Sequence, residues 1–273
     1  MNPSDLKGPA LLAYHAEALH TRVGAAFPGS RAVFRGHDLH AELQHLDWFS
    51  LCAFGIFGRQ VPAGQLRLMS AAFVGSSYPD TRLWNNRVAA LAGSTRSTPN
   101  LGASAAQAIS EATIFGRGNE FRALDFFLKA RKQLEAGMAL PELLEKFLAQ
   151  GGRMAGYGRP ISTKDERMPL TLGLARELGL DQGPYLAMAW EMDRYFESTG
   201  RPLRMNLSAL LSAFAADFGW QPREYNQLMY IAFLAGVYPC YLEAADKPPG
   251  VLFATACHDV CYEGVPPRSW PTP

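Results

Sequence analysis

The chain has 273 residues, 48% of them hydrophobic and 19% charged, which is enough to form a sizeable buried core. Its 26 Lys and Arg residues nearly balance 25 Asp and Glu residues, and the net charge of +1 excludes the strong basic field that favours nucleic acids or anionic membranes as partners. Residues 1–12 contain neither a long apolar run nor a small-residue cleavage site, and four cysteines do not form a disulfide framework in a chain of this length. We therefore expect a soluble, cytoplasmic protein.

Apolar residues recur at helical spacing along most of the chain, whereas strand-like alternation is confined to residues 32–34 and 251–253. Helical patterns occur, in chain order, at residues 11–19, 66–73, 170–178, 186–195 and 210–218. Proline marks the expected start of further helices over residues 63–74, 101–115 and 142–150. The apolar run 228–242 is shorter than the roughly 20 residues of a membrane span and contains Pro239. We predict a nearly all-helical fold of about ten helices and no membrane-spanning segment.

Two stretches, residues 152–169 and 247–273, lack helical periodicity and are rich in Gly, Pro or charge. Loops of this length often carry a site. The first loop contains a flexible turn followed by a mixture of cations and carboxylates, namely Gly156, Tyr157, Gly158, Arg159, Lys164, Asp165, Glu166 and Arg167. Cations beside accessible backbone groups suit a phosphate or carboxylate ligand, because charge-assisted hydrogen bonds are the stronger ones. An ordinary solvated charged loop is the alternative interpretation.

Several common kinds of active site are missing from the sequence. The histidines stand at positions 15, 20, 37, 40, 45 and 258, so a Ser-His or Cys-His nucleophile would need an imidazole from one end of the chain. Neither the glycine pattern of a dinucleotide site nor that of a phosphate-binding loop occurs. Cys257 and Cys261 flank His258 at a spacing that is not typical of structural zinc, so no metal is expected.

The first loop resembles the citrate synthase signature, a Gly-aromatic-Gly-His turn followed by Asp-Pro-Arg, which stands here as residues 156–161 and Asp165-Glu166-Arg167. Three other stretches resemble family elements in the family's order, at residues 34–39, 113–120 and 259–266. Trp84-Asn85, Phe115 and the compact length resemble the citryl-CoA lyase branch. The chain is therefore similar to the citrate synthase superfamily over nearly its whole length.

The resemblance implies an all-α fold with a large helical domain, residues 1–116 and 213–273, and a small helical domain, residues 117–212. It also implies a homodimer that takes coenzyme A or an acyl-CoA as substrate, together with a carboxylate, in the cleft between the domains. The coenzyme A contacts would fall on Gly156, Tyr157 and Gly158. The substrate contacts would fall on Arg167, Lys164, Trp84, Asn85 and Phe115.

The sequence departs from the family pattern at the residues that perform the chemistry. The family's Asn-Val-Asp, which supplies the catalytic carboxylate, reads Asn206-Leu207-Ser208 here, and a serine hydroxyl cannot act as a base near neutral pH without a partner base. The loop histidine is Arg159, which stays protonated and can bind a carboxylate or an oxyanion but cannot shuttle protons. The other histidine is replaced by Phe115, or by Trp84 on the lyase pattern.

Two functions remain open on these residues. The first, which we favour, is a CoA-thioester-dependent carbon–carbon lyase or synthase that acts on a polar carboxylate substrate with a rearranged site. In it Arg159 and Arg167 bind a carboxylate or oxyanion, Ser208 and Asn206 supply hydrogen bonds, and the base comes from Asp165, Asp259 or His258. The alternative is a catalytically inactive, citrate synthase-like ligand-binding or partner subunit, because the base and both imidazoles are lost together. Ordinary citrate synthase activity is expected to be absent.

Overall fold

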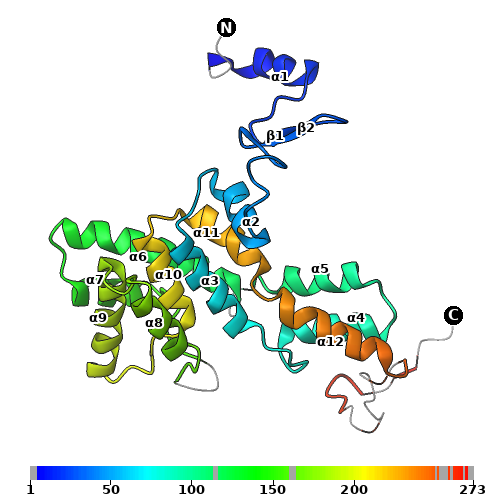
Figure 1. Cartoon of the computed structure of the whole chain (residues 1–273). Coiled ribbons are helices and arrows are strands. Elements are labelled where there is room, and N and C mark those ends of the chain that lie inside the picture. Colours follow the sequence, from blue (N-terminus) through cyan, green and yellow to red (C-terminus); the bar gives the residue numbers. More distant parts are fainter. Residues whose placement is uncertain are drawn as a thin grey trace. The chain divides into compact units, whose positions relative to one another are not determined.

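The computed structural model describes residues 5–112, 116–159, 164–249, 251, 258, 261–266 and 268–269. The described residues form helices and one small sheet, so the predicted all-α class is confirmed (Figure 1). Packing divides the chain into two compact units, Met1–Ser76 with Ala112–Ala232, and Ser77–Glu111 with Phe233–Pro273. The predicted small domain, residues 117–212, lies inside the first unit, and its boundary with a large domain stays a prediction.

The first unit begins with helix α1 (Gly8–Glu17), which has no buried residue, and a small antiparallel sheet. The strands are β1 (Gly24–Phe27), β2 (Arg31–Phe34) and β3 (His37–Asp38), in the order β1-β2-β3. Ala25 pairs with Val33, and Val33 pairs with Asp38. The strand expected at residues 32–34 is therefore present, whereas most of the ribbon expected at 251–253 lies outside the described residues.

The remaining helices of the first unit surround one apolar core. They are α2 (Trp48–Phe57), α3 (Ala63–Ser76), α6 (Arg117–Glu135), α7 (Leu140–Ala149), α8 (Met168–Glu177), α9 (Pro184–Ser198), α10 (Leu207–Asp217) and α11 (Pro222–Leu228), followed by the 3-10 turn Met229–Ile231. Helix α10 is the central one, because every residue from Ala209 to Ala216 is buried and the helix packs on both α6 and α9. An apolar helix of this kind is typical of a core rather than of a surface.

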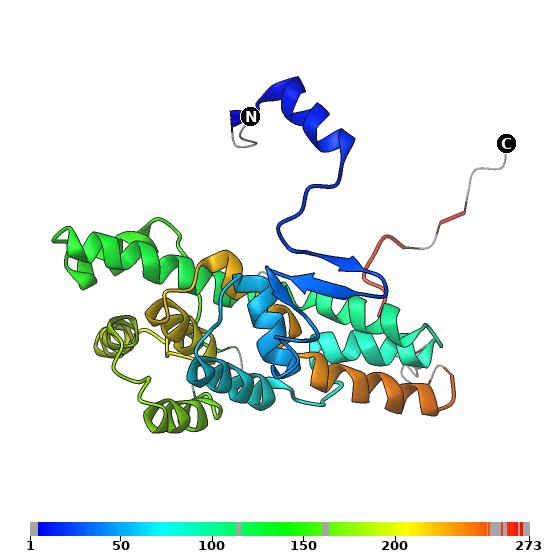
Figure 2. The same cartoon turned by 45° about the horizontal axis from the view of Figure 1, so that its top comes forward.

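The second unit consists of α4 (Trp84–Ser94), α5 (Pro99–Ile109) and α12 (Leu234–Asp246), which pack pairwise. The same three helices, blue-green and orange, lie side by side in Figures 1 and 2. Their core is built from small residues around Val237 and Tyr241. A Cβ at Gly93 would collide with the Tyr241 carbonyl oxygen, so glycine permits the close approach of α4 and α12.

The prolines act as the sequence predicted, since α3 follows Pro62, α5 begins at Pro99 and α7 has Pro141 in its first turn. The expected absence of a membrane-spanning segment stays a prediction. Among the described residues, the stretch Pro222–Asp246, which comprises α11, the 3-10 turn and α12, is long and apolar enough to cross a membrane by length and composition. Of its apolar window, 44% is buried within the structure, and core helices of soluble proteins meet the same criteria. The apolar run 228–242 alone therefore does not exclude a membrane span.

Candidate functional site

The glycine turn at residues 156–158 is bonded to the segment that leads into α10. The Gly158 N–H donates to the Arg204 carbonyl at 2.7 Å, and the Asn206 N–H donates to the Gly156 carbonyl at 3.0 Å. The Asn206 side-chain amide donates to the Gly158 carbonyl at 2.9 Å. Gly156 has a φ of +83°, and a Cβ there would come within 2.6 Å of the Ala209 Cβ. The turn therefore fixes where α10 starts, and the expected coenzyme A contacts of this turn stay a prediction.

Tyr157 anchors the same turn to α9. Its side chain is buried, with the residue 5% exposed, and its hydroxyl donates to the Ala189 carbonyl at 2.8 Å. The ring lies edge-on against Phe196, and burial raises the pKa of the phenol well above its usual value. In this conformation the Tyr157 ring is part of the core, so a ligand contact by the turn would have to come from its backbone.

Asp165 joins the charged loop to the start of α10. Its buried carboxylate, 1% exposed, receives the Arg167 Nε and Nη2 at 2.8 and 2.7 Å and the Leu207 N–H at 2.9 Å. Burial by itself would raise the pKa of Asp165, but the hydrogen bonds and charge of Arg167 and the Leu207 N–H lower it below the ordinary value. A carboxylate held by these donors is a poor proton acceptor. This geometry argues against Asp165 as the recruited base.

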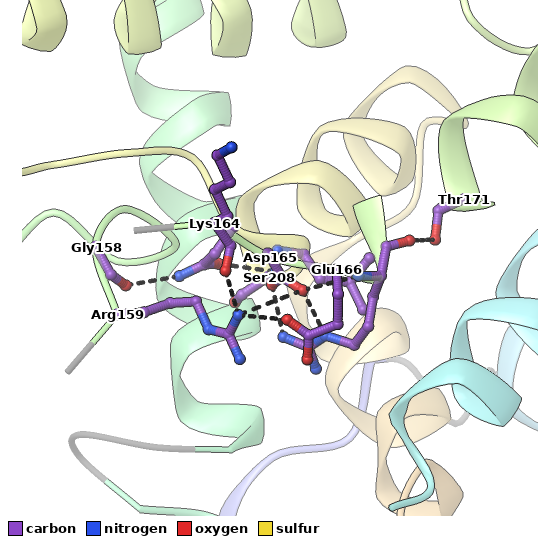
Figure 3. Close-up of polar contacts among 10 residues, drawn as sticks. Gly158, Arg159, Lys164, Asp165, Glu166, Thr171 and Ser208 are labelled. Carbon is purple, nitrogen blue, oxygen red and sulfur yellow. Dashed lines mark hydrogen bonds and ion pairs between the residues drawn. The ribbon is translucent and has the colours of Figure 1, made fainter. Parts of the chain in front are cut away.

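Arg159 approaches the same carboxylate from the other side. Its Nη1 donates to the Lys164 carbonyl at 2.5 Å, pairs with Glu166 Oε2 at 2.8 Å and lies 4.0 Å from Asp165 Oδ1. Figure 3 shows the Arg159 guanidinium directed toward Glu166 and Asp165, with Ser208 of α10 beside them, whereas the Lys164 side chain extends away. Glu166 is exposed, with 61% of its side chain accessible, so an incoming carboxylate can compete with it for Arg159.

A groove of about 900 Å³ adjoins this loop within the first unit. It is bordered by Lys164 and Asp165, by residues of α8 and α9, and by the segment 200–205. Arg204, on its wall, pairs with Asp193 and Glu197 at 2.8 and 2.7 Å. The volume is within the range of small-molecule and cofactor sites. The charged loop therefore lies beside a hollow rather than on a flat surface.

Asn206 and Ser208, two of the predicted catalytic residues, lie at the N-terminus of α10. Asn206 is the N-cap and accepts the Ser208 N–H at 2.9 Å, so its role in the fold is clear. The Ser208 hydroxyl oxygen is buried and has no hydrogen-bond partner within the described part of the chain. Ser208 thus stands where the resemblance places the catalytic acid, with its hydroxyl uncommitted.

The structure adds a residue that sequence reasoning missed, Glu120 in the first turn of α6. It is 9% exposed, and burial raises its pKa from an ordinary 4.5 to about 7, against the opposing effects of Arg167, the Ser208 hydroxyl and Arg117. Its Oε2 has no hydrogen-bond partner among the residues described. Glu120 is the last residue of the stretch 113–120 that resembles a family element, so the sequence did mark its position. Its closeness to Ser208, however, arises only from tertiary packing.

The other candidates belong to the second unit or lie outside the described residues. Trp84, whose indole donates to the Ile109 carbonyl at 3.2 Å, the buried Asn85 and the exposed His258 belong to the second unit. Their roles stay predictions. Phe115 and Asp259 lie outside the described residues. Where the structure describes the chain, no cluster of three or more His, Cys, Asp or Glu residues could hold a metal ion.

Comparison with known proteins gives a clear result for the fold. No protein-family model and no curated protein sequence matches the chain. Among solved structures, citryl-CoA lyase from Hydrogenobacter thermophilus is similar with a TM-score of 0.78 and 20% identity, over 92% of this chain and 97% of the lyase. ATP citrate lyase from Methanothrix soehngenii, solved with citrate and coenzyme A, is similar with a TM-score of 0.74 and 14% identity, over 96% of this chain and 43% of that protein.

A citrate synthase from Thermoplasma acidophilum, solved with carboxymethyl coenzyme A and oxaloacetate, is similar over 82% of this chain and 58% of its own, with a TM-score of 0.63 and 16% identity. The chain thus spans nearly all of the citryl-CoA lyase but only about half of the other two. These likenesses show that the chain shares the fold of these three enzymes, which confirms the citrate synthase-like fold that the resemblance implied.

Proposed function

We propose that this chain is a CoA-thioester-dependent carbon–carbon lyase or synthase, related to citryl-CoA lyase and citrate synthase, that acts on a polar carboxylate substrate with a rearranged active site. One observation carries the proposal. Arg159 and Arg167 converge on Asp165 at the start of α10, beside a groove of about 900 Å³, in a fold shared with enzymes that were solved with coenzyme A ligands.

The two arginines fit the binding of a carboxylate or of a developing oxyanion. Arg167 is held in a fixed orientation by its two hydrogen bonds to Asp165, while 22% of its side chain remains accessible. Arg159 is similarly part-exposed, and its carboxylate partner Glu166 is replaceable by a ligand. Guanidinium groups suit this role because they bind carboxylates in a bidentate geometry and stay charged at all physiological pH values. The polar substrate would therefore lie against Arg159 and Arg167, with the thioester toward Ser208.

Assembly and location follow the resemblance. We propose a homodimer in the cytoplasm, with coenzyme A or an acyl-CoA as substrate rather than as a resident group. The exposed apolar side chains of the N-terminal helix, Leu12 and nearby Leu19, are compatible with a partner subunit.

A second candidate function is a ligand-binding or partner subunit without turnover. The observation that favours it is that Ser208 replaces the expected acid while Asp165 is already held by Arg167 and the Leu207 N–H. Such a protein would bind coenzyme A and leave thioesters intact.

Isothermal titration with coenzyme A and acetyl-CoA, followed by incubation with citryl-CoA and chromatographic detection of acetyl-CoA, separates these functions. We expect binding and acetyl-CoA release, with release abolished in Arg159→Ala and retained in the control Arg223→Ala, an exposed arginine of α11. Binding without release in the wild type supports the second function. No heat at millimolar ligand rules out both.

A further inference from the structure

Three helices of the first unit contribute buried polar atoms that have no hydrogen-bond partner among the described residues. These atoms are Glu120 Oε2 of α6, Ser208 Oγ of α10 and the Tyr225 hydroxyl oxygen of α11. The Ser212 hydroxyl connects two of these helices, since it donates to the carbonyl oxygens of Ser208 and Glu120 at 2.7 and 3.0 Å. Buried polar groups are nearly always paired, so a cluster of unpaired ones in one place calls for a functional explanation.

Two cations and one phenol lie near Glu120. Arg117 belongs to the same helix, Arg167 precedes α8, and Tyr225 faces it from α11. The Arg117 Nη1 donates to the Tyr230 carbonyl at 2.7 Å. Arg167 is engaged by Asp165. The charges of both arginines lower the pKa of Glu120, but burial outweighs them and raises it to about 7, so the carboxyl can take up a proton near neutral pH.

Ser208 lies against this carboxyl and close to the surface. Its hydroxyl is near enough to stabilise the ionised form of Glu120, although no hydrogen bond is formed in this conformation. Ser208 as a residue is part-exposed, whereas Glu120 is buried. A substrate at the start of α10 would therefore reach Ser208 before Glu120, and the Ser208 hydroxyl oxygen, buried in this conformation, would have to be uncovered for the reaction.

We propose that Glu120 is the proton acceptor of Ser208, and that this pair replaces the acid missing from position 208. The inference rests on the proposed function and specifies its base. In the synthesis direction the C–H bond of the thioester α-carbon breaks and leaves its electron pair in the enolate. The proton moves to Ser208 Oγ while the serine proton moves to Glu120 Oε2. In the cleavage direction the same protons return, and the enolate carbon is protonated as the acyl-CoA product forms.

The arrangement resolves the chemical problem of a serine at this position. A lone serine hydroxyl holds its proton too tightly to act as a base, but a hydroxyl with a carboxylate behind it can pass a proton on. A carboxyl with a pKa of about 7 is well matched to this task, because it is both available as a base and able to return the proton near neutral pH.

The test is the exchange of the acetyl-CoA methyl protons in D₂O, followed by proton NMR with the full-length protein. The wild type should exchange these protons at a rate that rises with pH and levels off above about pH 7. Glu120→Gln and Ser208→Ala should each slow exchange at least about 100-fold. Glu142→Gln, an exposed glutamate of α7, is the matched control and should exchange at the wild-type rate. The double variant Glu120→Gln/Ser208→Asp should recover part of the rate, because a carboxylate is restored at position 208.

Isothermal titration with acetyl-CoA, run on the same variants, distinguishes the possible failures. Unchanged binding with lost exchange in Glu120→Gln supports the inference. Wild-type exchange in Glu120→Gln or in Ser208→Ala overturns the inference and leaves the proposed function standing. Binding without exchange in the wild type also overturns the inference, and the release of acetyl-CoA from citryl-CoA then decides between the two proposed functions. Absence of binding in the wild type overturns the proposed function and the inference with it. If Glu120→Gln does not fold, Ser208→Ala alone decides.

Discussion

Glu120 should make the protein less stable as the pH rises, and this effect is measurable without any substrate. Its pKa is about 7 in the folded protein and about 4.5 when the carboxyl is fully solvated. Between these values the folded state holds a proton that the unfolded state has released, so the free energy of unfolding falls as the pH rises. The difference of about 2.5 pKa units corresponds to about 3 kcal/mol of stability lost between pH 4 and pH 8.

Urea unfolding of the wild type and of Glu120→Gln, at pH values from 4 to 8, isolates this contribution. The amide cannot ionise, and every other titrating group cancels in the difference between the two proteins. The wild type should lose about 3 kcal/mol relative to Glu120→Gln across this range, with most of the loss between pH 4.5 and 7. A difference that is independent of pH would show that burial does not raise the pKa of Glu120, and a wild type that gains stability as the pH rises would show that Glu120 is ionised and paired in the folded protein.

Three further predictions concern the architecture of the site. Asp165→Ala should lower the free energy of unfolding by about 3 kcal/mol, because it leaves Arg167 and the Leu207 N–H without their buried acceptor; a loss below about 1 kcal/mol in urea unfolding would refute this. Gly156→Ala should cost about 2 kcal/mol or more, since the new Cβ meets Ala209 at a φ of +83°, and an unchanged melting temperature would contradict it. Tyr157→Phe should cost about 1–2 kcal/mol through the loss of the bond to the Ala189 carbonyl, with wild-type stability as the opposing result.

The helical fold was predictable from the sequence because its signals are local. Apolar spacing and the prolines before residues 63 and 101 and at residue 141 mark elements whose boundaries depend on their own backbone, so α3, α5 and α7 begin where expected. The loop at residues 152–169 was also identified correctly as non-helical up to its last residues, where α8 begins at Met168. The sequence could not show that this loop fixes the start of α10, because the hydrogen bonds between Gly158 and Arg204 and between Asp165 and Leu207 join residues more than 40 positions apart.

Glu120 could not be identified as the candidate base from the sequence, because its environment also depends on contacts between distant residues. Asp165 looked available because nothing in the sequence shows that Arg167 and the Leu207 N–H surround its carboxylate. Glu120 looked ordinary because an acidic residue in the first turn of a helix is a common stabilising feature. Its burial and its position against Ser208 arise only when α6 packs on α10, and both properties depend on that contact.

A crystal structure of the protein with acetyl-CoA bound would show whether Ser208 and Glu120 form the reacting site. We expect the thioester methyl group within about 3.5 Å of Ser208 Oγ, as a productive geometry requires, with Glu120 behind the serine and Arg159 and Arg167 facing the adjoining space. Acetyl-CoA bound at a distance from the start of α10, with Ser208 and Glu120 making no approach to the thioester, would contradict this expectation.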